Sequence, residues 1–312
     1  MLDTGDPIPE DKDAVIMVED IVKNGDGSIT IHAAAAPWQH IRQIGEDVCA
    51  GEMILPSHMT VSPAAIGAMI AGGVLEIEVI RKPVVGIIPT GDEIIPPCTD
   101  PKPGDILEFN GSIFSAMVRS WGAEAVVYPI VPDKFDQIKE MVAKAADECD
   151  MVILNAGSSA GREDFSARVI RELGEVLYHG IAIKPGKPFA YGRVDGGAGA
   201  AHFMGLPGNP VSCFITFAML VRPFLLRLQG VLDVAPKTIA ARADFDWPRA
   251  DKRREFLRVR LNADGHLERF ANQSSGVLTS TVWGDGVVDN PPGQAIARGD
   301  SVRFIPFGGL LA

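Results

Sequence analysis

Cysteine is scarce in this 312-residue chain, and the four cysteines stand far apart at positions 49, 98, 149 and 213. No two of them have the C-x-x-C spacing of a zinc or redox motif, so reduced structural thiols are expected rather than disulfides or metal ligands. His179 likewise has no second histidine or cysteine at metal-ligand spacing. A metal site in this chain would therefore be expected to use oxygen ligands.

Long runs of one charge and long uninterrupted apolar runs are also missing. The 29 basic and 40 acidic residues give a net charge of −11, and the basic residues form no long run, which argues against a nucleic-acid partner. The most apolar segment, 211–228, is broken by Arg222, Pro223 and Arg227, so a buried helix is expected rather than a membrane span. The first residues are acidic and contain proline, unlike a signal peptide, and a cytoplasmic location is expected.

The chain is 46% hydrophobic, enough for a large core, and its patterns predict four regions. Residues 1–44 form a partial β-rich domain, with a hairpin between 14–18 and 28–32 around the turn Asn24-Gly25-Asp26-Gly27. Residues 45–81 contain a helix capped by Ser62 and an alternating strand over 74–80. Residues 231–312 lose the helical period, which is typical of a small β-barrel or sandwich, and a barrel is expected.

The region 82–230 alternates strands and helices. Strands are expected at 84–88, 125–128 and 151–154, and helices at 112–121, 135–146 and from Ser166 onward. The 135–146 segment repeats Ile138, Met141, Val142 and Ala145 along one helix face. This alternation is typical of an α/β fold with a central, doubly wound, mostly parallel sheet, whose ligands bind at the carboxyl ends of the strands.

Three loops that follow these strands carry acidic residues: Glu93 after Thr90, Asp133 after Pro132, and Asp164 after a loop containing Gly157, Ser158, Ser159 and Gly161. Each acid taken alone could cap a helix or lie in a solvated turn, and the glycine-serine loop could be an ordinary strand-to-helix turn. Three acids at one sheet edge instead suggest a site for Mg²⁺ next to a bound phosphate.

Further candidates follow in the second half of the chain. Lys184 and Lys187 flank a stiff Pro-Gly turn and could bind an anion, or could be plain surface lysines. Pro207 and Pro210 lie where a long helix begins, which could be helix initiation alone. Ser275 lies in a polar loop that could contact a ligand or serve only as a connection.

In this order, the motifs resemble the molybdopterin molybdenumtransferase family, which includes MoeA and the gephyrin E domain. The matching segments are Thr4-Gly5, Gly45-Glu46-Asp47, Pro89-Thr90-Gly91-Asp92-Glu93, Asp133, the 157–164 loop, Lys184-Pro185-Gly186-Lys187-Pro188 and Leu206-Pro207-Gly208-Asn209-Pro210-Val211-Ser212. The resemblance implies the molybdopterin-binding fold and an enzyme that inserts molybdate into adenylylated molybdopterin, with Mg²⁺-dependent release of AMP.

The resemblance also implies residue roles. Glu93, Asp133 and Asp164 would support the metal and the adenylyl phosphate as catalytic and metal-binding acids. The substrate-binding residues would be Thr4, Asp47, Thr90, Gly157, Ser158, Ser159, Gly161, Lys184, Lys187, Pro207, Pro210 and Ser275. The implied partners are the pterin substrate, a second copy in a homodimer, the pterin adenylyltransferase and the enzymes that accept the cofactor.

Departures from the family pattern leave an alternative open. The resemblance begins near Thr4, without the segment that the family usually carries upstream, Ala156 stands for a familiar glycine, and Lys134 follows Asp133 in place of an acid. A truncated, noncatalytic molybdopterin-binding or scaffold protein is the alternative. A pterin-adenylylating module is disfavoured because it would lack the flanking β-rich regions.

Overall fold

A computed structural model describes residues 1–32, 34–155, 165–197 and 199–311. The chain divides into two compact units, Met1–Glu78 and Val79–Ala312. This division lies close to the predicted boundary at residue 81. The other predicted boundaries, after residues 44 and 230, stay predictions.

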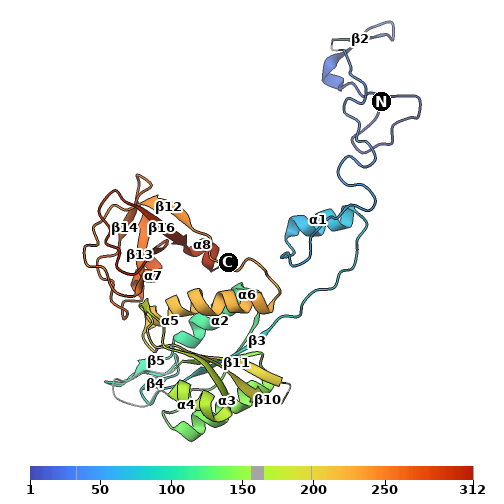
Figure 1. Ribbon diagram of the computed structural model, residues 1–312. Helices are drawn as coiled ribbons and strands as arrows, with labels where there is room; N and C mark the ends of the chain where they lie inside the picture. The colour runs from blue at the N-terminus through green and yellow to red at the C-terminus, as the bar shows by residue number, and fades with distance from the viewer. Residues whose placement is uncertain (33, 156–164, 198, 312) are drawn as a thin grey trace. The chain divides into compact units, whose positions relative to one another are not determined.

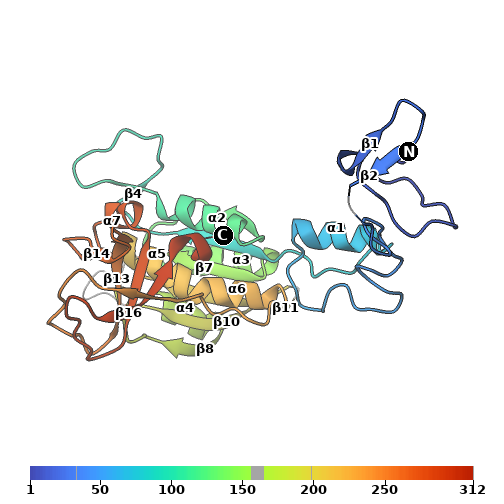
Figure 2. The same cartoon turned by 90° about the horizontal axis from the view of Figure 1, so that it is seen from above.

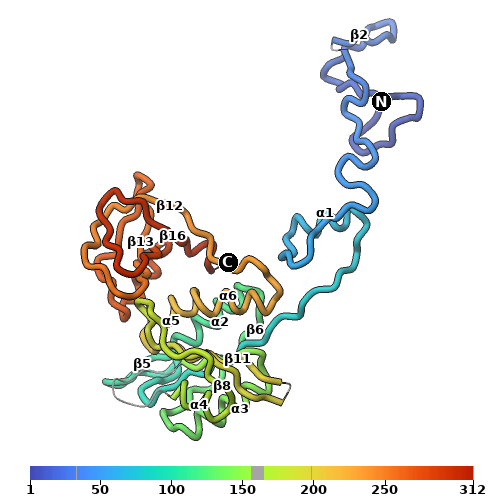
Figure 3. The backbone as a smooth tube through the Cα atoms, viewed as in Figure 1, coloured from blue at the N-terminus to red at the C-terminus, as the bar shows by residue number. Residues whose placement is uncertain are grey.

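The first unit contains little regular structure, and its backbone follows an irregular path for most of its length (Figure 3). Its elements are the 3-10 helix Val18–Asp20, the strands β1 Ile21–Lys23 and β2 Ile29–Ile31, and the helix α1 Pro63–Ala71. The predicted hairpin turn is present, but the prediction that 14–18 forms its first strand is wrong. The partner of β2 is β1, in the register Lys23 to Ile29, because a tight turn pairs the residues directly beside it.

Helix α1 begins as predicted, since the Ser62 hydroxyl accepts a hydrogen bond from Ala65 N at 3.1 Å and proline occupies the first helical position. The predicted strand over 74–80 is absent from the structure. Within the described residues this segment pairs with no strand, and Leu75 is 81% exposed. Alternation alone does not make a strand without a neighbour to complete the hydrogen-bond ladder.

The second unit is built on the predicted α/β sheet (Figure 1). Its strand order is β6-β3-β7-β11-β10-β8, with parallel pairing from β6 to β11 and antiparallel pairing of β10 with both neighbours. The bounds are β3 Val84–Pro89, β6 Glu124–Val127, β7 Met151–Asn155, β8 Gly174–His179, β10 Ala190–Gly196 and β11 Gly199–Leu206. Every residue of β7 is buried, as expected of a central strand covered on both faces.

Helices cover both faces of this sheet (Figure 1). One core packs α2 Asn110–Ser120 and the helix of α5 Pro210–Thr216, a π-helical turn Phe217–Val221 and α6 Arg222–Leu228 against the sheet. The other core packs α3 Phe135–Glu148 and α4 Phe165–Leu173 against the opposite face. Of the predicted apolar stripe of α3, Ile138, Val142 and Ala145 are fully buried there, and Met141 is partly buried.

The continuous helix Pro210–Leu228 is 19 residues long and apolar enough, by length and composition, to cross a membrane. Its most apolar window is 56% buried inside the protein, and Phe217 stacks on Phe114 of α2 with ring centroids 4.3 Å apart. Its side chains therefore belong to the first core, as expected from the sequence.

Two further sheets complete the unit. The short strands β4 Ile94–Ile95 and β5 Ile106–Leu107 pair as a parallel ribbon, and the chain between them forms a projecting loop (Figure 2). The C-terminal sheet has the order β12-β16-β15-β13-β14, and β9 Ile183–Lys184 joins it by pairing with β13. Its elements are β12 Ile239–Arg242, β13 Arg254–Leu261, β14 Leu267–Arg269, β15 Gly286–Asn290 and β16 Ser301–Pro306, with the helices α7 Thr279–Trp283 and α8 Phe307–Leu310.

The outer strands of the C-terminal sheet approach each other. A single parallel bridge joins Ala243, directly after β12, to Leu267 of β14, and Asp244 N donates to Leu267 O at 2.7 Å. This bridge favours the barrel predicted from the sequence, and complete closure stays a prediction. The first core extends to this sheet through Phe256, Val287 and Ile305, so the two large sheets share apolar packing.

Candidate functional site

Hydrogen bonds tie the loops that follow β3 and β6 to each other and to the last residue of β7. Thr90, buried at the end of β3, donates to Asn155 O from its backbone N at 3.1 Å and from its hydroxyl at 3.0 Å. Gly91 N donates to Val131 O at 3.2 Å, and the Asp92 carboxylate accepts from Asp133 N at 3.0 Å. The carboxyl ends of three neighbouring parallel strands are therefore held at one edge of the sheet, as such a fold requires of a ligand site.

A cleft of about 680 Å³ opens at this edge. One part of its lining is polar and comes from the strand ends, including Glu93 and Asp133. The other part is apolar and comes from the β4–β5 ribbon, where Ile106 and Leu107 are exposed. The described residues that line the cleft are Pro89, Thr90, Asp92, Glu93, Ile94, Ile106, Leu107, Glu108, Phe109, Asn110, Asp133, Asn155, Gly208, Asn209 and Pro210.

Gly91 lets the chain turn into the cleft beside Glu93. Its φ is +146°, and a Cβ at this position would lie 2.6 Å from Ile94 Cγ1 and 3.2 Å from Glu93 Oε2. An L side chain here would meet both an unfavourable backbone conformation and a steric clash. The position of the Glu93 carboxylate therefore depends on a glycine at 91.

The structure brings Glu93 and Asp133 into the same cleft and adds Asp92 and Glu108 to them. Among the described residues, no three histidine, cysteine, aspartate or glutamate side chains stand close enough to enclose a metal ion. Mg²⁺ usually takes one or two protein carboxylates together with phosphate oxygens and water. The carboxylates of this cleft fit that mode of binding, and they do not fit a closed site for a softer metal.

Glu108 and Asn110 are among the cleft residues that the sequence analysis did not propose. Glu108 Oε1 accepts from Gly111 N at 2.6 Å in the first turn of α2, and Asn110 Nδ2 donates to Gly208 O at 3.4 Å. Asn110 Oδ1 is buried without a hydrogen-bond partner. The sequence signal for Glu108 is its position three residues before Gly111, at the start of a helix. The strand directly before it, β5, has two residues and is too short to be recognised from a periodic pattern.

The floor of the cleft continues into the helix that begins at Pro210. Pro207 is buried, and its carbonyl oxygen accepts a hydrogen bond from the Cys213 thiol. Burial raises the pKa of this thiol well above its ordinary value, so it stays protonated and can donate. Ser275 reaches the same region from the C-terminal sheet, where its carbonyl oxygen accepts from Val211 N at 3.0 Å.

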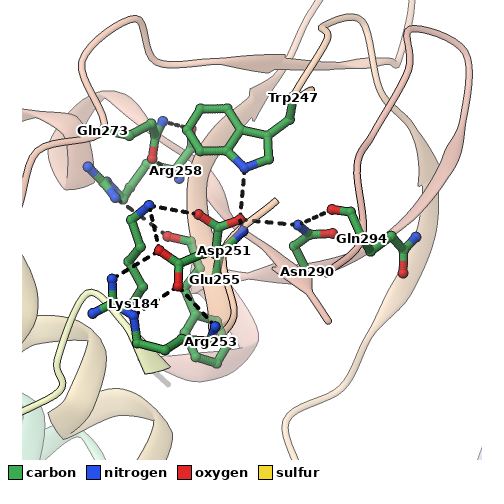
Figure 4. A network of polar contacts seen from close by, with 10 residues as sticks. Lys184, Trp247, Asp251, Arg253, Glu255, Arg258, Gln273, Asn290 and Gln294 are labelled. Carbon is green, nitrogen blue, oxygen red and sulfur yellow. Dashed lines mark hydrogen bonds and ion pairs between the residues drawn. The ribbon is translucent and has the colours of Figure 1, made fainter. Parts of the chain in front are cut away.

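The loop that carries Ser275 is fastened to a buried arginine on β13. Arg258 is 1% exposed and donates to Ser274 O at 3.1 Å and to the Ser280 hydroxyl at 3.1 Å. Its backbone N–H and C=O exchange hydrogen bonds with the Gln273 side chain (Figure 4). Burial lowers the pKa of the guanidinium to about 10, so it remains charged at neutral pH. Within the described residues no carboxylate pairs with it.

The two predicted lysines are not among the described residues that line the cleft. Lys184 lies on β9, where its Nζ is 3.1 Å from Asp251 Oδ2 and 3.1 Å from Glu255 Oε1. Lys187 is exposed and lines a shallow groove with Lys252, Arg253 and the strand-end residues 180–182. The structure thus places Lys184 beside carboxylates near the C-terminal sheet and Lys187 in an exposed groove, and neither lysine lines the cleft with the acids.

The remaining candidates lie in the first unit or outside the described residues. Thr4 and Asp47 are exposed residues of the separate unit Met1–Glu78. Gly157, Ser158, Ser159, Gly161 and Asp164 lie outside the described residues. Asn155, the last described residue before them, lines the cleft.

Three family models match successive parts of the chain. They are the MoeA N-terminal region (domain I and II) at residues 2–73, the probable molybdopterin binding domain at 86–227 and the MoeA C-terminal region (domain IV) at 240–307. The α/β sheet with its cleft falls within the second match.

Curated relatives cover most of the chain. The molybdopterin molybdenumtransferase of Haemophilus influenzae is 33% identical over 99% of this chain and 77% of its own length. Molybdopterin molybdenumtransferase 2 of Mycobacterium tuberculosis is 32% identical over 92% of this chain and 72% of its own. The chain spans 60% of the Staphylococcus aureus (strain MSSA476) molybdopterin molybdenumtransferase, at 30% identity.

Solved structures agree with these relatives. A molybdopterin biosynthesis MoeA protein of Pyrococcus horikoshii superposes with a TM-score of 0.78 at 30% identity, covering 97% of this chain and 73% of that one. A molybdenum cofactor biosynthesis protein of Pyrococcus furiosus gives a TM-score of 0.64 at 26% identity, over 84% of this chain and 82% of that one. The predicted fold class and the resemblance read from the motifs are confirmed, and the chain belongs to the MoeA family of molybdopterin molybdenumtransferases.

Proposed function

We propose that this chain inserts molybdate into adenylylated molybdopterin and releases AMP in a Mg²⁺-dependent reaction. The observation that carries the proposal is the cleft in which Glu93 and Asp133 face an apolar ribbon. Flat, partly apolar rings with a charged phosphate bridge need both kinds of surface within one site. The names of the relatives, which describe transfer of molybdenum to molybdopterin, support the same assignment.

The polar part of the cleft would receive the phosphate groups. Glu93 and Asp133 would hold Mg²⁺, together with Asp164, and the bound ion would offset the charge that develops when the phosphoanhydride breaks. The protein keeps the loops that carry Glu93 and Asp133 in place through the Thr90–Asn155 and Asp92–Asp133 hydrogen bonds. Fixed donors and acceptors need little reorganisation during the reaction, which is the main source of electrostatic catalysis.

The apolar part would receive a ring of the substrate. Ile106, Leu107 and Phe109 offer aliphatic and aromatic surface directly beside Glu108, whose carboxylate can accept hydrogen bonds from ring N–H groups. We assign the pterin to this wall because its aminopyrimidinone edge offers two adjacent donors, whereas the corresponding edge of adenine includes an acceptor that a carboxylate would repel. Molybdate would bind next to the pterin sulfur atoms.

The remaining parts of the proposal concern the setting of the enzyme. Lys184, Lys187, Thr4, Asp47, the 157–161 loop and Ser275 would contact the substrate, and Pro207 and Pro210 would shape the pocket. A homodimer, a cytoplasmic location and contacts with the pterin adenylyltransferase and the cofactor-accepting enzymes complete the proposal.

Release of AMP from adenylylated molybdopterin, measured with molybdate and Mg²⁺ present and with each omitted, tests the proposal. We expect release only when both are present, and a large loss in Glu93→Gln. A binding measurement on the same protein separates the alternative function. Tight binding of adenylylated molybdopterin without release of AMP would support a noncatalytic pterin-binding protein and contradict the enzyme.

A further inference from the structure

A backbone pairing brings Lys184 to a buried glutamate on the C-terminal sheet. β9 runs parallel to β13, with Ile183 opposite Arg254 and Lys184 opposite Glu255. Arg254 N donates to Ala182 O at 2.9 Å and extends the pairing by one residue. The lysine therefore reaches Glu255 through the register of the strands and does not depend on a flexible loop for its position.

Glu255 is held from several sides in an environment that excludes water. It is 1% exposed, and its Oε2 accepts from Trp247 Nε1 at 2.8 Å and from Asn290 Nδ2 at 3.4 Å (Figure 4). Both donors are neutral, and the other oxygen, Oε1, lies 3.1 Å from Lys184 Nζ. A buried carboxylate needs a cation as well as hydrogen bonds, and the Lys184 ammonium supplies it.

The ammonium itself remains partly open to solvent. The Lys184 side chain is 42% exposed, and its second carboxylate, Asp251, already forms a two-point ion pair with Arg253, with Nε and Nη2 both at 3.0 Å. Burial alone would lower the pKa of Lys184, but its hydrogen bonds to Glu255 and Asp251 outweigh burial and raise the pKa above the ordinary value. Lys184 thus presents a charged, oriented N–H group beside the groove that Lys187 lines.

We propose that Glu255 is a positioning residue for Lys184: it fixes the ammonium at the junction of β9 and β13 and orients it for contact with an anionic group of the substrate. The contact with substrate rests on the proposed function. The placement of the ammonium rests only on the geometry of Lys184, Glu255, Trp247 and Asn290. No sequence motif pointed to Glu255, because it lies 71 residues after Lys184 and belongs to a different strand, β13.

The placement is tested by the pH dependence of Lys184 acylation in the intact protein, followed at that residue by mass spectrometry. In Glu255→Gln, which retains an oxygen acceptor for Trp247, we expect the midpoint of acylation to fall by about one pH unit or more. Asp289→Asn is the matched control, because Asp289 is a buried carboxylate of the same sheet that pairs with Arg254 and Arg303 instead. An unchanged midpoint in folded Glu255→Gln, or an equal fall in Asp289→Asn, would overturn the placement.

A reciprocal variant keeps the test decisive if Glu255→Gln does not fold. Lys184→Met leaves the buried Glu255 carboxylate without its ammonium, so we expect a loss of stability at neutral pH that shrinks as acid protonates Glu255. Lys187→Met, an exposed neighbour, should show no such pH dependence. Equal behaviour of the two variants at neutral and acidic pH would also overturn the placement.

Turnover separates the failure of this inference from the failure of the proposed function. In an active enzyme, Glu255→Gln should raise the KM for molybdate or for the adenylylated pterin more than it lowers kcat, and should move the alkaline limb of the pH profile to lower pH. A shifted acylation midpoint in Glu255→Gln, together with a wild-type protein that never releases AMP, would support the placement and contradict the function. An unshifted midpoint in an active enzyme would contradict the placement alone.

Discussion

Asp92 supports the cleft through a neighbouring loop. Its carboxylate accepts the backbone N–H of Asp133 at 3.0 Å, so the loop after β3 fixes the loop after β6. In Asp92→Ala this bond is lost, and we expect the apparent affinity for Mg²⁺ in the AMP-release assay to fall by about 10- to 100-fold, as when the support of a metal ligand is removed. Asp92→Asn keeps an oxygen acceptor and should lose less.

The outcome that would contradict this role of Asp92 is a Mg²⁺ dependence of Asp92→Ala equal to that of the wild type. Asp92 is exposed, so its replacement should change the free energy of unfolding by less than about 0.5 kcal/mol. A large loss of stability would instead show that the residue supports the fold and not the cleft.

Gly91 allows a second prediction at the scale of one residue. Gly91→Ala adds a Cβ 2.6 Å from Ile94 Cγ1 at a φ of +146°, and we expect it to cost about 1 to 3 kcal/mol of stability and to reduce AMP release. Gly104→Ala is the control, because Gly104 also has a positive φ, +101°, but has no atom within 4 Å of the added Cβ. Equal activity losses in the two variants would show that backbone strain, and not the Glu93 side of the cleft, is responsible.

The Lys184 ion pairs also predict how stability depends on pH. The pKa of Lys184 is raised in the folded protein above its ordinary value of 10.5. The stabilisation is therefore fully present below pH 10.5 and is lost as pH rises through the higher folded value. Chemical denaturation at increasing pH should show that the wild type loses stability in this range, whereas Lys184→Met should not show this alkaline loss. Identical dependence of stability on alkaline pH in the two proteins would contradict the prediction.

At the scale of the element, sequence periodicity predicted those pieces whose burial is simple. The unbroken apolar run 151–154 became the central strand β7, and the helical spacing of Ile138, Val142 and Ala145 became the buried face of α3. Both patterns reflect burial of apolar residues in the central sheet or against it, and such burial can be recognised from a short stretch of sequence. The prediction that Glu93 and Asp133 lie at one edge followed from the strands, because parallel strands place their carboxyl ends together.

The failures have a different physical origin. The alternating segment 74–80 had the pattern of a strand but no partner within the described residues. The segment 14–18 does not pair with β2, because the residues directly beside the turn, Ile21–Lys23, form that pairing instead. Strand formation depends on a neighbour that may lie anywhere in the chain. Lys184 and Glu255 show the same limit for a site, because β9 pairs with a strand that begins about 70 residues later.

The β4–β5 ribbon supplies a prediction for one element. Ile106→Ser removes apolar surface from the cleft wall, and we expect roughly tenfold weaker binding of adenylylated molybdopterin, from about 1 to 2 kcal/mol of lost burial. Ile239→Ser is the matched control, since Ile239 is exposed to a similar degree, 54% against 46%, on β12 of the other sheet. Titration by calorimetry with the pterin and with AMP separately checks which ring lies on this wall; weaker binding of AMP alone would assign it to adenine.

At the scale of the whole molecule, one hydrophobic core of the unit Val79–Ala312 is shared by its two large sheets. Phe256, Val287 and Ile305 of the C-terminal sheet pack in the same cluster as the helices over the central sheet. The Val211–Ser275 hydrogen bond and the β9–β13 pairing add polar connections between them. A substitution in the C-terminal sheet can therefore alter the cleft by moving the helix that begins at Pro210.

The two units should differ sharply in protection from hydrogen exchange. In the described part of Met1–Glu78, the buried apolar side chains are Ala65 and Met69, whereas β7 is buried throughout. We expect the slowest exchange at β7 and fast exchange over 74–80, because protection requires buried, paired backbone groups. A homodimer would add a partner for the first unit, so protection of 74–80 should then rise with protein concentration while that of β7 stays constant. Strong protection of 74–80 at the lowest concentration, where the protein is a monomer, would contradict this account, because it would require stable pairing within a single chain.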